Sequence, residues 1–106
     1  HAIILGASFK ENCPDFRNSK VIDIYNELKE FGVLVEIYDP HVMKDDFFNE
    51  FKIAIVSELR KYDLIILAVS HNEFYKLDIS SLKKTNLSVV FDTKSFLDRS
   101  LVDCRL

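Results

Sequence analysis

The heptapeptide DLIILAV, residues 63–69, is the strongest strand signal in the chain. Its last six residues, Leu64 to Val69, form an unbroken apolar run, which is typical of a strand in a parallel sheet that is covered on both faces. Residues 2–7 (AIILGA), 33–38 (VLVEIY) and 87–92 (LSVVFD) also read as strands. Between the first two of these, apolar residues recur three and four positions apart and a glycine follows, which predicts a helix over about 18–31. A strand, a helix and a strand in this order predict a right-handed crossover.

The middle of the chain gives a weaker pattern. The phenylalanines near residue 50 favour a short helix, residues 53–56 an edge strand and residues 57–61 another helical turn. Residues 72–84 are long enough for a further short helix between two strands. Together these elements predict a doubly wound α/β domain.

Size and charge describe a single domain. The chain has 106 residues, 48% of them hydrophobic, and a formal net charge of −3. A chain of roughly 100 residues buries about two-thirds of its unfolded surface, so we expect one domain over residues 1–106 that needs neither disulfides nor a structural metal. The sequence contains no block of basic residues, so it does not predict binding to nucleic acid or to an anionic membrane. Its apolar runs are all far shorter than the ~20 residues that a membrane-spanning helix needs.

The low numbers of glycine, cysteine and histidine residues exclude several kinds of site. Gly6 and Gly32 are the two glycines, too few and too far apart for a dinucleotide fingerprint or a P-loop. Cys13 and Cys104 are also far apart, which argues against a zinc ribbon or a dithiol pair and favours reduced thiols. The three histidines match no compact metal motif, so we expect no metal site. Because a strand follows His1 directly, we expect a fragment of a longer protein.

Candidate ligand contacts lie where the strands end. In an open parallel sheet, ligands bind beyond the carboxyl ends of the strands, where the strand order reverses. The first such loop brings Lys10, Arg17 and Lys20 to the amino end of the predicted helix, whose free amides and dipole favour a phosphate or pyrophosphate. The alternative is that these cations are solvated or paired with neighbouring carboxylates, while Asp15 or Asn18 caps the helix.

Three further residues lie at the same predicted rim. Lys94 either brings another cation to the site or is simply a solvated lysine. Asp39 precedes a proline, and we favour a role in starting that turn. His71 either donates a hydrogen bond to a ligand or is a loop histidine bonded to backbone, and the second interpretation is favoured.

The run GASFKENCPDFRNS, residues 6–19, closely resembles the opening of the carboxyl-terminal, UDP-binding domain of the UDP-glucose/GDP-mannose dehydrogenase family. Residues 33–40, 63–74 and 91–98 resemble later segments of that domain in the same order, so the resemblance covers nearly the whole chain. It implies a three-layer, Rossmann-like domain with a mostly parallel sheet flanked by helices.

The resemblance also implies a function. Members of this family oxidise the 6-hydroxyl of a nucleotide sugar to a carboxylate, using two NAD and a cysteine nucleophile that forms a thioester. It implies that NAD and that cysteine belong mainly to amino-terminal and middle domains outside this chain, and that the present domain closes over the UDP-sugar. The whole enzyme would be a cytoplasmic homodimer or higher oligomer. The sequences of these motifs resemble the branch that acts on UDP-N-acetylhexosamines, for capsule or O-antigen synthesis, more than the UDP-glucose branch.

Individual residues take their implied roles from the same motifs. Phe9 and Lys10 match a pair that contacts the sugar nucleotide, and Arg17 matches an arginine that reaches the NAD held by another domain. Lys94 matches a basic residue that helps to hold UDP and is arginine in many members, so the bidentate fork of arginine is absent here. The resemblance places no catalytic residue and no metal ligand in this chain.

A freestanding nucleotide-binding or regulatory module without catalysis is the alternative function. It would require a start codon near His1 and affinity for UDP without partner domains. A response-regulator-like domain is disfavoured, because SFK at residues 8–10 stands where the first acidic cluster of such domains is expected.

Overall fold

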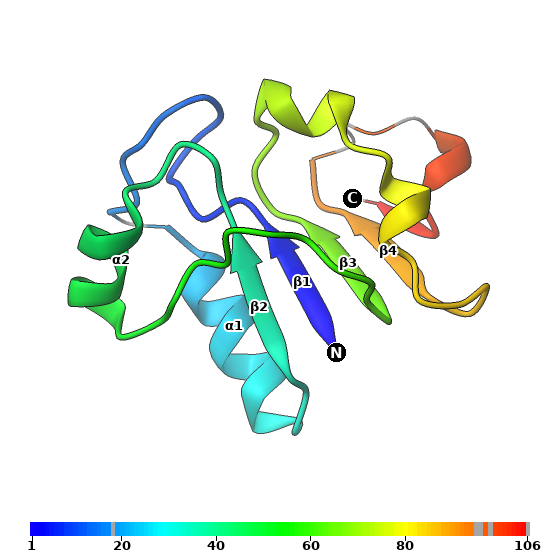
Figure 1. The fold of residues 1–106 in the computed structure, drawn as a ribbon, viewed down its shortest axis with the longest axis horizontal. Helices are drawn as coiled ribbons and strands as arrows, with labels where there is room; N and C mark the ends of the chain where they lie inside the picture. Colours follow the sequence, from blue (N-terminus) through cyan, green and yellow to red (C-terminus); the bar gives the residue numbers. More distant parts are fainter. Residues whose placement is uncertain (18, 95–96, 98, 106) are drawn as a thin grey trace.

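The computed structural model describes residues 1–17, 19–94, 97 and 99–105. Within these residues, parallel strands form one five-stranded sheet in the order β2-β1-β3-β4-β5 (Figure 1). The strands are β1 (Ala2–Leu5), β2 (Val35–Tyr38), β3 (Leu64–Leu67), β4 (Val89–Asp92) and β5 (Cys104–Arg105). The chain runs from β1 to β2 at one edge and then returns to β3 on the other side of β1. This order confirms the predicted doubly wound α/β fold and places the reversal between β1 and β3.

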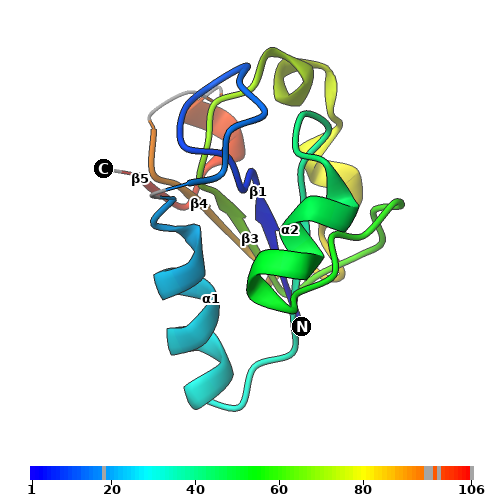
Figure 2. The ribbon, with the colours of Figure 1, turned by 90° about the vertical axis from the view of Figure 1, so that its left-hand side faces the viewer.

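Helices cover both faces of the sheet. The helices α1 (Val21–Glu30) and α2 (Lys44–Phe51) pack against the face that carries Ile4, Ile37 and Ile66, which stand side by side in the register. Figure 2 shows α1 on one side of the sheet and α2 beside the β2 edge. Three 3₁₀ helices follow later strands, namely η1 (Asn72–Lys76), η2 (Ile79–Leu82) and η3 (Arg99–Leu101). None of the helices in the described part of the chain combines the length and hydropathy that crossing a bilayer requires.

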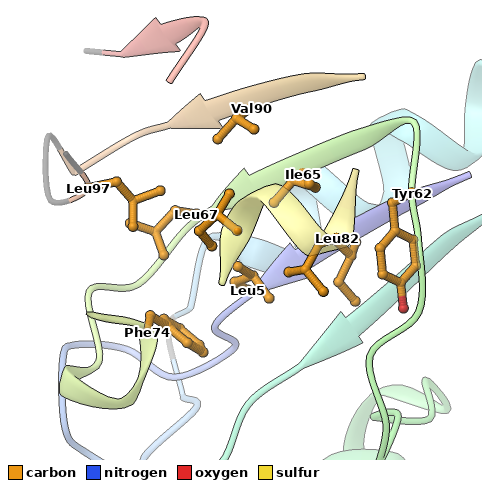
Figure 3. Close-up of a cluster of buried hydrophobic side chains, with 10 residues drawn as sticks. Leu5, Tyr62, Ile65, Leu67, Phe74, Leu82, Val90 and Leu97 are labelled. Atoms are coloured by element: carbon orange, nitrogen blue, oxygen red, sulfur yellow. The ribbon is translucent and has the colours of Figure 1, made fainter. Parts of the chain in front are cut away.

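The second face of the sheet carries its own core. Leu5, Ile65 and Leu67 point from the central strands toward Phe74 and Leu82 of the 3₁₀ helices (Figure 3). Phe74 is fully buried there, as are the three strand residues. Alternate residues of one strand thus enter two cores, which is why the strands read as continuous apolar runs.

Several local predictions were wrong. Residues 53–56 form no strand, since Ile55 makes a single parallel bridge to Ile37. Residues 57–61 are not helical, and the Arg60 amide donates to the Tyr62 hydroxyl instead of to a helical carbonyl. Residues 72–84 form two 3₁₀ helices rather than one helix, because Leu77 between them is extended. The edge strand β5 was not predicted.

Candidate functional site

A cleft of about 410 Å³ opens at the carboxyl ends of the strands, where the strand order reverses. It lies between the loops that follow β1, β3 and β4 and the first residues of α1. Its polar and aromatic lining consists of Ser8, Phe9, Ser19, Lys20, Thr93 and Lys94, and Val69 supplies apolar surface. This is the position at which an open parallel sheet accepts a ligand.

The cleft combines positive charge with one exposed aromatic ring. Lys20 and Lys94 are both exposed, and Lys20 is the residue that immediately precedes α1. The amino end of this ten-residue helix therefore adds partial positive charge beside the two ammonium groups. Phe9 is 58% exposed, although it is a large apolar side chain. An anion with a planar or apolar portion suits such a lining.

A buried carboxylate fixes the turn that carries Lys94. Asp92 ends β4 and is fully buried. Its Oδ1 accepts the amide of Lys94 at 2.9 Å, and its Oδ2 accepts the amide of Leu97 at 2.7 Å. The hydroxyl of Thr93 donates to the carbonyl of Leu67 in β3 at 2.8 Å. The backbone below Lys94 is therefore held to two strands, while its side chain stays exposed.

Gly6 brings the first loop against the end of β3. Its φ of +104° ends β1, and a Cβ at this position would lie 2.6 Å from the Cβ of Val69. A distance this short does not occur between real side chains, so a residue without a Cβ is required here. The close approach places Ser8 and Phe9 beside Val69 in the cleft.

The structure brings some of the predicted site residues together and separates others. Phe9 and Lys94 line the same cleft, with Lys20 between them in sequence. Lys10 and Arg17 belong to the same loop but lie outside the lining of this cleft, and both are exposed.

The guanidinium of Arg17 is paired with a neighbouring carboxylate, one of the arrangements anticipated from the sequence. It donates to both oxygens of Asp15, at 3.0 and 2.9 Å. These hydrogen bonds lower the pKa of Asp15 to about 2 and raise the pKa of Arg17. Asp15 does not cap α1, because Lys20 is the capping residue and makes no side-chain cap bond. Asn18, the other predicted cap, lies outside the described residues.

A buried polar network beside the cleft joins Ser8, Asp39 and His71. The Oδ2 atom of Asp39 accepts the amides of Ala7 at 2.7 Å and Ser8 at 3.2 Å, and it lies 2.8 Å from Nε2 of His71. Oδ1 accepts the amide of His41 at 2.7 Å, which confirms that Asp39 starts the turn at the end of β2. Burial alone would raise the pKa of Asp39, but the hydrogen bonds from His71 and the backbone outweigh it and lower the pKa.

The other ring nitrogen of His71 confirms the favoured interpretation of this residue. Nδ1 accepts the backbone amide of Asn12 at 2.8 Å. Neither Ser8 nor Asn12 was predicted from the sequence to be a site residue. The signal for Ser8 was its position two residues past Gly6, where the first predicted strand ends.

A smaller cavity of about 340 Å³ lies on the outer side of this network. It is lined by Asn12, His41, Asn72, Glu73 and Lys76. His41 and Glu73 are 2.9 Å apart, and this hydrogen bond lowers the pKa of Glu73.

The described residues offer little to a metal ion. Among them, no three His, Cys, Asp or Glu side chains gather as a metal site requires. Cys13 is a free thiol, and the side chain of Cys104 lies outside what the structure describes.

Comparison with known proteins gives the site a family context. Residues 3–99 match the family model of the UDP-glucose/GDP-mannose dehydrogenase family, UDP binding domain. UDP-N-acetyl-D-glucosamine 6-dehydrogenase of Pseudomonas aeruginosa is 41% identical over 108 residues, covering 98% of this chain and 26% of that protein. Protein CapL of Staphylococcus aureus is 38% identical over 99 residues, covering 90% of this chain and 23% of that protein.

A solved structure agrees with these sequence matches. The native structure of the UDP-N-acetyl-mannosamine dehydrogenase Cap5O from Staphylococcus aureus superposes with a TM-score of 0.73 at 28% identity. The superposition covers 98% of this chain and 25% of that chain. The present chain thus spans about a quarter of the length of the relatives it matches.

Proposed function

This chain belongs to the UDP-glucose/GDP-mannose dehydrogenase family, and we propose that it is the UDP-sugar-binding domain of an NAD-dependent nucleotide-sugar 6-dehydrogenase. The whole enzyme would oxidise the C6 hydroxyl of a UDP-N-acetylhexosamine to the uronate, for capsule or O-antigen polysaccharide. The names of the UDP-N-acetylglucosamine and UDP-N-acetylmannosamine relatives support this sugar class over UDP-glucose. The observation that carries the proposal is the cleft at the strand-order reversal, where Phe9 lies with two lysines and the amino end of α1.

The proposed binding mode follows from the charges around the cleft. The diphosphate would lie between Lys20 and Lys94, where the positive end of the α1 dipole adds to both ammonium groups. Phe9 would present its exposed ring to the uridine or the sugar. Lys10, next in the chain and exposed, would contact the sugar nucleotide from the rim. Held in this way, the sugar C6 would be oriented toward groups supplied by other domains.

The described residues do not form a binding turn for NAD. In a dinucleotide fold the helix begins at a glycine-rich turn directly after the first strand, whereas here residues 6–20 separate β1 from α1. Position 8 is serine and position 9 phenylalanine, so the backbone cannot approach a pyrophosphate as a glycine turn does. Among the described residues we propose one contact with NAD, through Arg17, as the family resemblance implies.

Calorimetric titration of the chain with UDP tests the proposed binding mode. We expect UDP to bind and uridine, which lacks the phosphates, to bind far more weakly. Lys20→Ala and Lys94→Ala should each weaken UDP binding about tenfold, a loss of ~1.4 kcal/mol. Lys29→Ala is the matched control, because Lys29 lies in the last turn of α1, away from the cleft. Equal affinity of all three variants would contradict the assignment of the cleft.

Sequencing the gene upstream of the His1 codon tests the enzyme proposal separately. We expect an in-frame extension that encodes a dinucleotide fingerprint and a cysteine nucleophile. A stop codon directly upstream, with UDP binding retained, would instead favour a freestanding nucleotide-binding module.

A further inference from the structure

The network of Ser8, Asp39 and His71 has no role in the binding mode described above. All three residues are buried, and His71 is fully inaccessible. They come from the ends of three different strands: Ser8 follows β1, Asp39 follows β2 and His71 follows β3. A buried, charged group at such a junction is costly unless it is fully hydrogen-bonded, as it is here.

The contacts fix the protonation state of His71. Nδ1 accepts a hydrogen bond from the Asn12 amide, so Nδ1 carries no proton. The hydroxyl of Ser8 donates to the Lys10 carbonyl at 2.8 Å and can therefore only accept from His71. The imidazole proton is thus on Nε2, shared between Asp39 Oδ2 at 2.8 Å and Ser8 Oγ at 3.1 Å. His71 is neutral, in one tautomer.

Both ring nitrogens hold the loop that carries the proposed substrate contacts. Nε2 bonds at residue 8 and Nδ1 bonds at residue 12, so the two attachment points bracket Phe9 and Lys10. Asn12 has a left-handed backbone with φ of +56°, and its side-chain oxygen accepts the Asn72 amide at 2.9 Å. The loop is therefore fastened to the end of β3 from both sides of the Phe-Lys pair.

We propose that His71 is a positioning residue for sugar-nucleotide binding, which holds Phe9 and Lys10 in their binding conformation through Ser8 and Asn12. This inference rests on the proposed function, because it assumes that the cleft binds UDP. It assigns the same role to Asp39, whose carboxylate orients the ring by accepting from Nε2.

Acid should release the loop. A proton added at Nδ1 removes the acceptor for the Asn12 amide and places two N–H groups against each other. The described titratable groups that face His71 are Asp39, the ring of His41 at 4.4 Å between centroids, and Glu73 bonded to His41. Adding that proton should therefore weaken UDP binding in acid by freeing the loop at residue 12.

Two isosteric variants separate the two attachments. The amide of glutamine reaches the position of Nε2, so His71→Gln keeps the donor to Asp39 but loses the acceptor for Asn12. Asparagine reaches the position of Nδ1, so His71→Asn keeps the acceptor and loses the donor. Asn12→Gly removes the link to Asn72 and suits the left-handed backbone. His1→Gln makes the same chemical change directly before β1, at the opposite, amino end of the strands, and serves as the control.

Titration of each variant with UDP from about pH 8 to about pH 5, with circular dichroism to confirm folding, tests the proposal. We expect UDP binding about tenfold weaker in His71→Gln at pH 8, with little further loss in acid. His71→Asn should also weaken UDP binding, because it loses the Nε2 bonds to Asp39 and Ser8, and Asn12→Gly should weaken binding while keeping the acid dependence. His1→Gln should match the parent throughout.

The outcomes distinguish the two proposals. UDP binding that is equal in the parent, His71→Gln and Asn12→Gly, with the same pH profile, overturns the positioning role and leaves the proposed function standing. If His71→Gln does not fold, UDP binding by Asn12→Gly, a change at an exposed residue, tests the positioning role instead: binding equal to the parent overturns it. A parent chain that binds no UDP overturns the proposed binding function, and the positioning role with it.

Discussion

Replacing Gly6 by alanine should destabilise the domain strongly, for two separable reasons. The φ of +104° costs a residue with a Cβ about 1–2 kcal/mol. The new methyl group would also lie 2.6 Å from the Cβ and 2.9 Å from the backbone nitrogen of Val69. The backbone nitrogen cannot rotate away as a side chain can, so relieving the overlap must move the end of β3, which costs about 1–3 kcal/mol more. Together these effects predict a loss of about 2–5 kcal/mol.

Gly32→Ala provides the matched control. Gly32 follows α1 with φ of +81°, and a Cβ there would meet no atom within 4 Å. We expect this variant to lose about 1–2 kcal/mol, from backbone strain alone. Urea unfolding followed by circular dichroism gives both free energies, and each kcal/mol of difference should appear as ~4–8 °C in Tm. Equal losses in the two variants would refute the steric argument, because both positions share the positive φ.

Three further predictions concern buried groups. Tyr62→Phe removes a hydroxyl that donates to Glu36 at 2.7 Å, and urea unfolding should show a loss of about 1–2 kcal/mol; an unchanged midpoint would contradict the importance of this bond. Phe47→Ala should cost about 3–5 kcal/mol because the ring is fully buried, whereas its neighbour Phe48, which is 46% exposed, should tolerate the same change far better in the same assay. The lowered pKa of Asp39 means that its carboxylate stabilises the fold fully above its ordinary pKa of 3.8 and loses this effect as pH falls through the lowered value. Unfolding free energies measured against pH should therefore fall less steeply in acid for Asp39→Asn, and identical slopes would contradict the assignment.

The secondary structure could be predicted where local chemistry is unambiguous. The runs at 2–7 and 63–69 each contain a four-residue strand, β1 and β3, with faces that enter two cores. The predictions failed where a single tertiary contact replaced a regular ladder. Ile55 meets β2 at one bridge, so an apolar run there reads as a strand without forming one. The strand β5 is two residues long, too short for any periodicity to indicate it.

The candidate site was likewise predicted only in part. Phe9 and Lys94 were identified from the motifs, and both line the cleft. The adjacent Lys10 and the nearby Arg17 were identified by the same reasoning, yet they lie outside the lining, and the guanidinium of Arg17 is paired with Asp15 instead.

A doubly wound α/β fold that binds ligands at the carboxyl ends of its strands could be predicted from the apolar runs, the helical spacing and the two glycines. These signals are local, because side-chain periodicity and backbone sterics are properties of a few consecutive residues. The position of the proton on Nε2 of His71 could not be predicted from such local signals. It depends on Ser8, Asp39 and Asn12, which lie 63, 32 and 59 positions away in the sequence. Hydrogen bonds are directional over about 3 Å, so only the folded sheet, which brings these strand ends together, assigns each donor its acceptor.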